Sequence, residues 1–451
     1  MKANKFPLLL GILLFFATFV RAQERTLTLQ EAIDLSIKNN KQIKLNAAKI
    51  EEATASLKGA KENRLPELSI SAAYLRVNKP DIDLKTSLGS GGGSSDTGSR
   101  SSSAVEVNQV MYGMASVSLP LFAGFKIQSG IESAKYLAQA ARLDAEVSRD
   151  EVIQNTIAAY SNLYKAQEAV TLVQENLKSS KQRTADFANL EKNGLLARND
   201  FLKVQLQESN IELSLLDAEN NVRITMVNMD LMLGLPETTI LTIDNTSLIS
   251  QQGDASTLLE WETSALQNRK EIAAMTAREK AAHAGIKYAK SDYYPSLALT
   301  GGYVAANIPN FLTISNAING GIGFKYTPSS LWKNGSKVAE AKARLLQVQI
   351  NQASLDDQIR LQINQTYQNY VLSLRKIEVY SKAVAQAEEN YRITKNKYDN
   401  SLANTTDLLD ADVAQLQAKL NYAYSKADAV VAYNKLLQTS GGMSNLSSSN
   451  K

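Results

Sequence analysis

The chain has 451 residues, enough for two or three ordinary globular domains, and it carries 49 Lys and Arg against 45 Asp and Glu. It contains no cysteine and one histidine, which excludes disulfides and thiol catalysis and leaves little material for a zinc site or a Ser-His-Asp triad. Only 8 Pro, 10 Phe and 2 Trp accompany long stretches rich in Ala, Leu, Gln, Asn, Lys and Glu, a composition typical of long helices.

Residues 1–22 have the pattern of a secretory signal peptide. Lys2 and Lys5 precede the apolar run LLLGILLFFATFV, and Ala22 predicts the cleavage position. Cleavage would remove three cations, including Arg21, and leave 46 basic against 45 acidic residues, a net charge of +1. This balance gives no support for binding of nucleic acid. The rest of the chain has no apolar run of the 18 or more residues that a transmembrane helix needs, so any membrane-spanning part must consist of strands.

The mature chain contains an internal repeat. Residues 28–66 match residues 257–295 at an offset of 229, and the later part of each copy aligns at an offset of 207, which pairs Asp200 with Asp407. The difference, 229 − 207 = 22, is the length of extra chain in the first copy. The Gly/Ser-rich segment 89–103 falls in this extra chain and predicts a flexible loop. In an outer-membrane barrel this loop is expected to face outward, because long barrel loops lie outside and periplasmic turns are short.

Each copy is predicted to contain a helix, two strands, a very long helix, a turn and a further helix. Alternation of apolar and polar residues predicts strands at 68–75, 115–122, 296–304 and 318–326. Aromatic residues near the strand ends resemble the girdle of outer-membrane barrel strands: Tyr74, Phe122, Phe125, Tyr303, Phe324, Tyr326 and Trp332. A soluble sheet is the alternative. Four strands cannot close a barrel and lipid does not tolerate open edges, so the membrane interpretation requires several chains.

These patterns divide the chain into segments. The expected segments are a signal peptide (1–22), a first repeat (23–234) with a loop at 78–105 and a tip turn at 193–200, a linker (235–256), a second repeat (257–441) with a tip turn at 400–406, and a flexible C-terminal tail (442–451). The fold class is therefore mainly α with a small β portion.

The first long helix is expected at 126–192, which is 67 residues and about 100 Å at the helical rise per residue. Along it, mostly small residues recur at alternating spacings of three and four, a heptad seam at positions 134, 138, 141, 145, 148, 152, 155, 159, 162, 166, 169 and 173. Small seam residues allow close helix approach and favour a wall of side-by-side helices, with an ordinary two-stranded coiled coil as the alternative.

The sequence offers no catalytic constellation. His283 lies in the Ala-rich helical stretch AREKAAHAGIKYAK and is interpreted as a surface or packing residue. No nucleophile–base pair, metal-ligand spacing or phosphate loop is present, because the GSGGG at 89–93 lacks the Lys and the following helix of a nucleotide site. We therefore expect neither enzymatic activity nor a cofactor.

Several segments together resemble the TolC-like outer-membrane efflux protein family over almost the whole mature chain. They are the duplicated halves, SVSLPLFAGF (116–125), the pattern YDNS (398–401) followed by DLLDA (407–411), and the final run AKLNYAYSKADAVVAYNKLLQTSG (418–441). The resemblance implies a homotrimer whose three chains give twelve strands of one outer-membrane β-barrel, surrounded by lipid and continuous with a coiled-coil α-barrel tunnel in the periplasm.

The resemblance also implies function. Such a channel exports small molecules or polypeptides in a tripartite efflux or type I secretion system, together with a periplasmic adaptor (membrane fusion) protein and an inner-membrane pump driven by protons or ATP. A periplasmic coiled-coil tether or adhesin is the alternative interpretation.

The same resemblance assigns residues to the far end of the tunnel. Carried over by motif, Asp407 and Asp410 are pore-facing carboxylates at a constriction, while Tyr398 and Asp200 occupy positions of a contact that holds the tip shut. The alternative is local, because carboxylates in the first turn of a helix cap it and suit its dipole.

This chain departs from the family pattern at the tips. Gly194 is in the first tip turn, but Ser401 replaces the usual glycine in the second. Ala403 stands where an Arg can make a further closing contact, so Arg198 on the other tip is the expected substitute.

Overall fold

The computed structural model describes residues 24–78, 107–244, 256–309 and 312–443. The expected signal peptide, the Gly/Ser-rich segment 89–103, part of the expected linker and most of the expected tail lie outside these residues.

The chain forms two compact units, and each draws on both copies of the repeat. Among the described residues, the helical unit comprises 24–50, 141–244, 256–274 and 352–443, and the sheet unit comprises 51–78, 107–140, 275–309 and 312–351. The units therefore cut across the repeats of the sequence.

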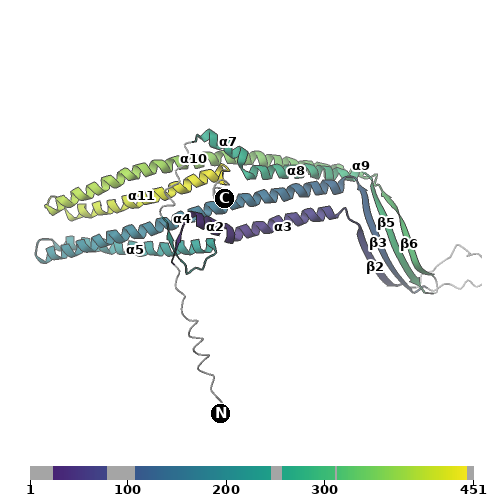
Figure 1. The fold of residues 1–451 in the computed structure, drawn as a ribbon, viewed down its shortest axis with the longest axis horizontal. Coiled ribbons are helices and arrows are strands. Elements are labelled where there is room, and N and C mark those ends of the chain that lie inside the picture. The colour runs from purple at the N-terminus through teal and green to yellow at the C-terminus, as the bar shows by residue number, and fades with distance from the viewer. Residues whose placement is uncertain (1–23, 79–106, 245–255, 310–311, 444–451) are drawn as a thin grey trace, which may run out of the picture. The chain divides into compact units, whose positions relative to one another are not determined.

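In each of the two copies, two helices, a strand pair, a long helix and a further helix follow one another along the chain (Figure 1). The helices are α2 (Leu29–Asn39), α3 (Lys41–Glu62), α4 (Lys126–Lys192), α5 (Arg198–Leu233), α7 (Leu258–Asn268), α8 (Lys270–Lys290), the short η1 (Ser291–Tyr293) and α9 (Ser330–Lys333), α10 (Gly335–Asp399) and α11 (Thr405–Thr439). The strands are β1 (Glu24–Leu27), β2 (Glu67–Arg76), β3 (Gln109–Ala123), β4 (Ile240–Ile243), β5 (Ser296–Ile308) and β6 (Leu312–Lys325). None of these described helices is long and apolar enough to cross a membrane.

Most predicted elements are present, and one prediction was wrong. The four predicted strands form, and α4 has the predicted bounds. The first helix of each copy, predicted as continuous, is broken into α2–α3 and α7–α8. The breaks fall at Asn40 and Arg269, 229 residues apart, where ψ is 133° and 128°. At the first break the Asn40 side chain accepts a hydrogen bond from the Gln42 amide (2.7 Å), which starts the next helix because it satisfies an otherwise unpaired N–H group.

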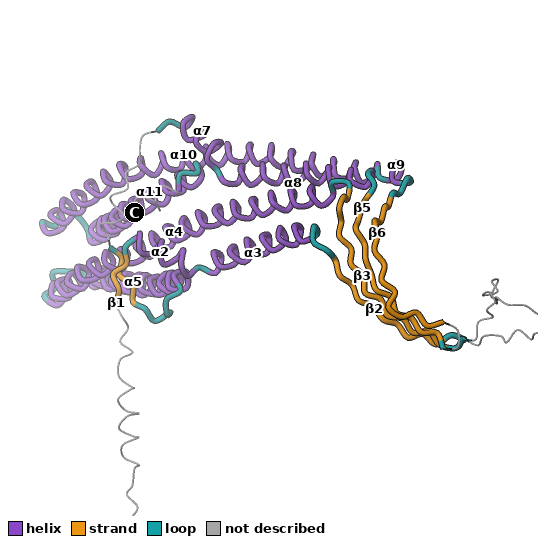
Figure 2. Tube along the Cα trace, turned by 45° about the vertical axis from the view of Figure 1, so that its right-hand side comes forward, coloured by secondary structure: helices purple, strands orange, loops and turns teal. Residues whose placement is uncertain are grey.

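The sheet unit contains one antiparallel sheet in the order β2-β3-β5-β6, and Figure 2 shows its strands side by side. Its register places like residues in rows: Ile70, Ala115, Tyr303 and Ile318 are paired neighbours, as are Ser69, Ser116, Gly302 and Asn319. Because side chains alternate along a strand, these rows lie on opposite faces.

Around Ser69 and Ile70 one face of the sheet is apolar and the other is polar, whereas toward the end of β2 and the start of β3 the polar face also carries Leu75, Tyr112 and Met114. The apolar face carries Leu68, Ile70, Tyr74, Val117, Leu119, Phe122, Leu297, Leu299, Tyr303, Ile318, Ile322 and Phe324, and the polar face carries Glu67, Ser69, Ser71, Ser116, Ser118, Ser296, Thr300, Asn319 and Lys325. Within one chain the apolar face is uncovered, since Ile70 is 79% exposed and Ile318 is 83% exposed. So large an apolar surface marks an interaction with protein or membrane.

A tight turn links β3 to α4 in the sheet unit. Gly124 has φ +60°, and a Cβ atom at this position would lie 2.5 Å from the carbonyl oxygen of Ser291. Phe125 follows with φ 69° and packs edge-on against Phe122 and Tyr294, at ring-centroid distances of 5.3 and 6.0 Å. The glycine of the SVSLPLFAGF segment is therefore required by the close approach of the Ser291 backbone.

The core of the helical unit surrounds the middle of α4. Strands β1 and β4 form a parallel pair, which no sequence pattern predicted. Tyr160 on α4 is fully buried and donates a hydrogen bond to the carbonyl of Leu27 (2.9 Å). The main cluster unites α2, α4, α5, α11 and this strand pair through Leu27, Leu29, Ile33, Ile153, Ile157, Tyr160, Leu163, Met229, Leu233, Leu241, Ile243 and Val430. In this part of α4, more side chains are therefore buried than those at the seam positions alone.

The predicted seam is otherwise a good description of the buried side of α4. Ala138, Ala166 and Val173 are buried, and most other seam residues are half-buried or buried. Asn155 and Asn162 are the exceptions, since both are exposed in the single chain.

Candidate functional site

The candidate site is the pair of helix–turn–helix tips in the helical unit, α4–α5 and α10–α11. At the first tip, the Gly194 amide donates to the carbonyl of Glu191 and the Leu195 amide donates to the carbonyl of Leu190, both at 2.9 Å. This is a Schellman turn, which satisfies the last carbonyls of a helix and needs a left-handed residue. Gly194 supplies it with φ +73°.

The second tip has the same turn with a different residue. The Ser401 amide donates to the carbonyl of Tyr398 (2.9 Å) and the Leu402 amide donates to that of Lys397 (2.7 Å). Ser401 holds φ 59°, a left-handed conformation that strains a residue with a Cβ atom. The half-buried Ala403 lies between this turn and the start of α11.

Asp407 belongs to a capping box at the start of α11. The side chain of Asn404 accepts from the Asp407 amide (2.9 Å), and the Asp407 carboxylate accepts from the Asn404 amide (3.3 Å). The corresponding start of α5 is Ala197, which makes no side-chain cap. Asp410 lies one turn further, is exposed, and has no hydrogen bond or ion pair with any residue that the structure describes. Helix capping thus accounts for Asp407 but not for Asp410.

A small apolar cluster joins the two tips. Phe187, Phe201, Val204 and Leu408 are buried in it. Tyr398 stacks on Phe187, with ring centroids 5.3 Å apart and planes 8° from parallel. The pKa of the Tyr398 hydroxyl is raised, mainly because the side chain is buried. The hydrogen bond with Thr405 partly offsets this increase, and the charge of Asp200 adds to it.

The structure gives the expected closing residues other partners. Asp200 forms an ion pair with Lys203 (3.2 Å), and no hydrogen bond joins it to Tyr398 within the described part of the chain. Arg198 pairs with Glu191 of its own hairpin (3.3 Å) and lies over the ring of Phe201 (5.4 Å).

Lys203, which sequence reasoning missed, makes the polar contact between the tips. Its ammonium group donates both to Asp200 and to the hydroxyl of Thr406 on α11 (3.4 Å). Nothing in the sequence marks this contact, because Thr406 lies on the other hairpin, 203 residues from Lys203.

A buried ion pair lies on the same helices. Arg183 on α4 contacts Asp412 on α11 through its two terminal guanidinium nitrogens, at 2.9 and 3.0 Å, and the two side chains are only 8% and 4% exposed. Asn176 donates to the same carboxylate (3.3 Å), and the Tyr391 hydroxyl on α10 accepts from Arg183 (3.4 Å). Burial lowers the pKa of Arg183, but its contacts with Asp412 and Tyr391 more than offset this and raise it.

The sequence contained a usable signal for this pair. The predicted seam ended at position 173, whereas the same alternation of three and four continues through Asn176, Ser180, Arg183 and Phe187. A charged side chain at a seam position is buried, so it requires a partner.

His283 lies on α8, where its ring is 3.9 Å from Glu279 and 56% exposed. Among the described residues, no group of three or more His, Cys, Asp or Glu side chains could hold a metal ion.

The chain resembles known proteins in both sequence and fold. The family described as outer membrane efflux protein matches residues 32–235 and 261–442. No curated protein sequence matches the chain significantly. Among solved structures, CusC has a TM-score of 0.76 at 16% identity, covering 92% of both chains. The CmeC outer membrane channel of Campylobacter jejuni has a TM-score of 0.74 at 19% identity, covering 92% of this chain and 85% of that one.

A third structure, the open state of the MtrE outer membrane channel of Neisseria gonorrhoeae, has a TM-score of 0.69 at 18% identity, with coverage of 92% and 89%. The TM-scores of these three structures show the shared fold alone, and the family is shown by the match that spans both halves of the chain. The tether or adhesin interpretation is not favoured, and channels of this family are trimers that work with an adaptor and an inner-membrane pump. The chain therefore belongs to the outer membrane efflux protein family, as an outer-membrane efflux channel with a periplasmic helical tunnel and not an enzyme.

Proposed function

We propose that this chain works as a homotrimer in which three four-stranded sheets close into one twelve-stranded barrel, 3 × 4. The observation that carries this proposal is the pair of open sheet edges, β2 and β6, beside an uncovered apolar face. Unpaired backbone groups are not tolerated in lipid, so each β2 must pair with β6 of a neighbouring chain. The apolar face then meets lipid and the polar face lines the pore.

Because the chain has no cysteine, the proposed edge pairing can be tested by cross-linking. We would combine Ser69→Cys on β2 with one cysteine on β6, at Asn319, Gly321 or Gly323. Ser69, Asn319, Gly321 and Gly323 all lie on the polar face. At one of these pairings, mild oxidation should give covalent trimers, while either cysteine alone should give none. Only monomers at every pairing would contradict the proposed barrel.

We further propose that the tips of the three chains form the constriction, with Asp407 and Asp410 facing the pore. Three copies would place six carboxylates around a narrow passage, attracting cations and repelling anions. The exposure of Asp410 without a partner in the described chain supports this role. The MtrE structure is described as an open state, which supports a tip that opens and closes.

The capping box allows charge and helix stability to be separated. Asp407→Asn with Asp410→Asn removes the charges, but the amide oxygen of the new side chain at position 407 could still accept from the Asn404 amide. The matched control, Asn404→Ala, breaks the cap at a cost of about 1 kcal/mol and keeps both charges. In planar bilayers, the double variant should lose cation selectivity and block by multivalent cations, and the control should keep both. An unchanged reversal potential in the double variant would contradict a pore-facing position.

Tip closure is proposed to use the Lys203 link between the hairpins, with Tyr398, Asp200 and Arg198 as candidates for contacts between chains. Lys203→Gln should raise the open probability of single channels because it breaks the contact with Thr406. An open probability equal to that of the wild type would show that Lys203 does not contribute to closure of the tip.

The kind of adaptor and the kind of pump that work with this chain are also proposals. We propose that the trimer works with a membrane fusion adaptor and with a pump driven by protons or ATP. Genes for both next to this one would support the assignment, and cross-linking in cells should capture the adaptor on the helical unit. Capture of a secreted surface ligand without an adaptor would contradict it.

A further inference from the structure

The sheet unit contains a cavity of about 440 Å³ where β3 and β6 end and β5 begins. Four lysines line it, from α4, β6, α9 and α10: Lys126, Lys325, Lys333 and Lys337. We call it the lysine cavity. Among its described lining residues the one acidic side chain is Asp292 in η1, and hydroxyl groups complete the wall: Ser291, Ser296, Thr327, Ser329 and Ser330.

Asp292 cannot neutralise these lysines. Its Oδ1 atom accepts from Lys126 (3.0 Å) and its Oδ2 atom accepts from Lys337 (2.9 Å), so both oxygens are engaged. The hydrogen bond with Lys337, together with that from Lys126, outweighs desolvation and lowers the pKa of Asp292. The carboxylate is thus ionised at neutral pH and already shared by two cations.

The other two lysines are uncompensated. Lys325 and Lys333 are exposed, and neither ammonium group has a hydrogen bond or ion pair with a residue in the described ranges. Four cations against one carboxylate leave a net charge of +3 around the lysine cavity. Cations gathered in a concave site raise the local potential and attract anions.

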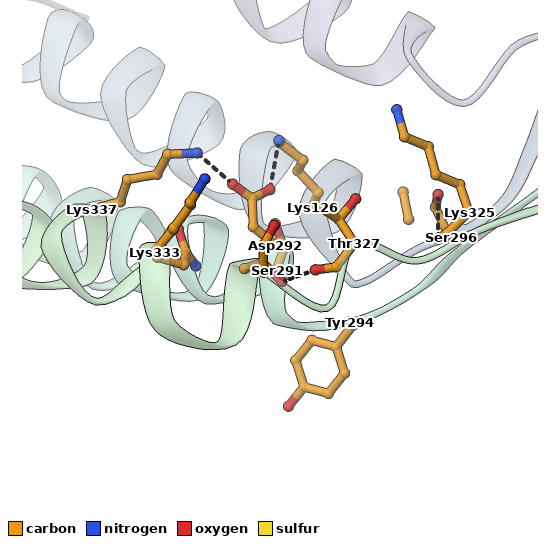
Figure 3. A pocket seen from close by; sticks show the side chains of 13 residues that line it. Lys126, Ser291, Asp292, Tyr294, Ser296, Lys325, Thr327, Lys333 and Lys337 are labelled. Carbon is orange, nitrogen blue, oxygen red and sulfur yellow. Dashed lines mark hydrogen bonds and ion pairs between the residues drawn. The ribbon is translucent and has the colours of Figure 1, made fainter.

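The lysines share a side of the sheet unit. Lys325 pairs in register with Ser296 on the polar face. Figure 3 shows the ammonium groups of Lys126, Lys333 and Lys337 on the side of the Asp292 carboxylate, while Tyr294 points the opposite way. Tyr294 packs against Phe125, which contacts Phe122 of the apolar face. The lysines therefore belong to the polar side, which in the proposed trimer lines the pore.

We infer that the lysine cavity binds a multiply charged oxyanion, a phosphate or polyphosphate group carried by a solute in the channel. The position in the pore rests on the proposed function, whereas anion binding by the cavity does not. The hydroxyl groups of Ser291, Ser296 and Ser330 already donate to backbone carbonyls, so Thr327 and Ser329 are the lining hydroxyls left to donate to further phosphate oxygens. Lysines bind phosphate as mobile point charges without the fixed fork of arginine, which suits the weak, reversible binding that passage through a channel requires.

The binding test uses the detergent-solubilised wild-type protein and sodium tripolyphosphate, titrated calorimetrically at low salt. Lys325→Gln with Lys333→Gln should weaken binding roughly tenfold. The matched control, Lys49→Gln with Lys376→Gln, removes the same charge from exposed lysines that do not line the cavity, and should leave binding unchanged. No binding to the wild type, or equal weakening in both variants, would overturn the site.

A second readout separates this inference from the proposed function. In planar bilayers, tripolyphosphate should block the wild-type current, and the cavity variant should need roughly tenfold more for the same block. If the protein binds tripolyphosphate but forms no channels, the proposed function fails and the site stands. If channels form but block is identical in the two variants, the pore site is wrong.

The phosphate could instead come from a lipid headgroup, and lipid analysis decides between the sources. Purified wild-type protein should carry no more anionic phospholipid than the cavity variant does. An excess of bound phospholipid that disappears with Lys325→Gln and Lys333→Gln would overturn the assignment to a soluble anion.

Discussion

The buried pair of Arg183 and Asp412 allows a sharp test of what holds the tip hairpins together. Arg183→Met alone would leave the Asp412 carboxylate buried, with Asn176 (3.3 Å) as its one other partner described here. Asp412→Leu alone would leave a buried guanidinium with only the Tyr391 hydroxyl (3.4 Å). Each single change should cost about 3–5 kcal/mol, because an uncompensated charge stays in a low-dielectric environment.

The double variant, Arg183→Met with Asp412→Leu, removes both charges and replaces them with apolar groups. We expect it to be within about 1–2 kcal/mol of the wild type, or more stable, because the desolvation of both ions is also removed. The two single losses would sum to about 6–10 kcal/mol, so the coupling between the sites is several kcal/mol.

The assay is thermal unfolding in detergent, followed by helical circular dichroism. Each single variant should melt roughly 5–15 °C below the wild type, and the double variant should recover most of the loss. The exposed pair Lys181–Glu212, at 3.0 Å on α4 and α5, provides the control. Lys181→Met should cost less than about 1 kcal/mol. A double variant as unstable as the sum of the singles would refute the reasoning, because the two charges would then act independently.

Three further predictions concern local features. Ser401→Gly should stabilise the second tip by about 1 kcal/mol, because φ is 59° there, and an unchanged melting temperature would show that the turn is unstrained. Gly124→Ala should abolish assembly of detergent-resistant trimers, since its Cβ would lie 2.5 Å from the Ser291 carbonyl oxygen, whereas Gly59→Ala, with nothing within 4 Å, should assemble normally. Burial, followed by the charge of Glu237, raises the pKa of Asp230 to about 6 from 3.8, so stability should fall as pH rises between these values. Asp230→Asn should therefore raise the melting temperature at pH 7.5 but not at pH 4, and equal effects at both would contradict this.

The features that the sequence predicted well depend on local periodicity. The bounds of α4 follow from an unbroken helical pattern, and the end at Gly194 follows from the need for a left-handed residue after the last turn. The strands follow from the alternation of apolar and polar residues, which arises because the two faces of the sheet differ in polarity. Asp407 at the start of α11 is likewise local, because a capping box involves residues three apart.

Other features depended on which faces meet in space. The parallel pairing of Leu27 with Ile243, the Lys203 contact with Thr406 and the pairing of Arg183 with Asp412 join residues more than 200 positions apart. Periodicity shows that a helix face is buried, but not which helix covers it.

By itself, then, the sequence determined most of the elements, the repeat and the family resemblance, because these are encoded by spacings along the chain and by motifs. Only the tertiary structure decided which charges are compensated. Asp292 meets Lys126 and Lys337 from two other elements, while Lys325 and Lys333 lack partners among the described residues. The physical reason is that ion pairs depend on distances of a few ångströms between side chains, and long-range packing sets those distances.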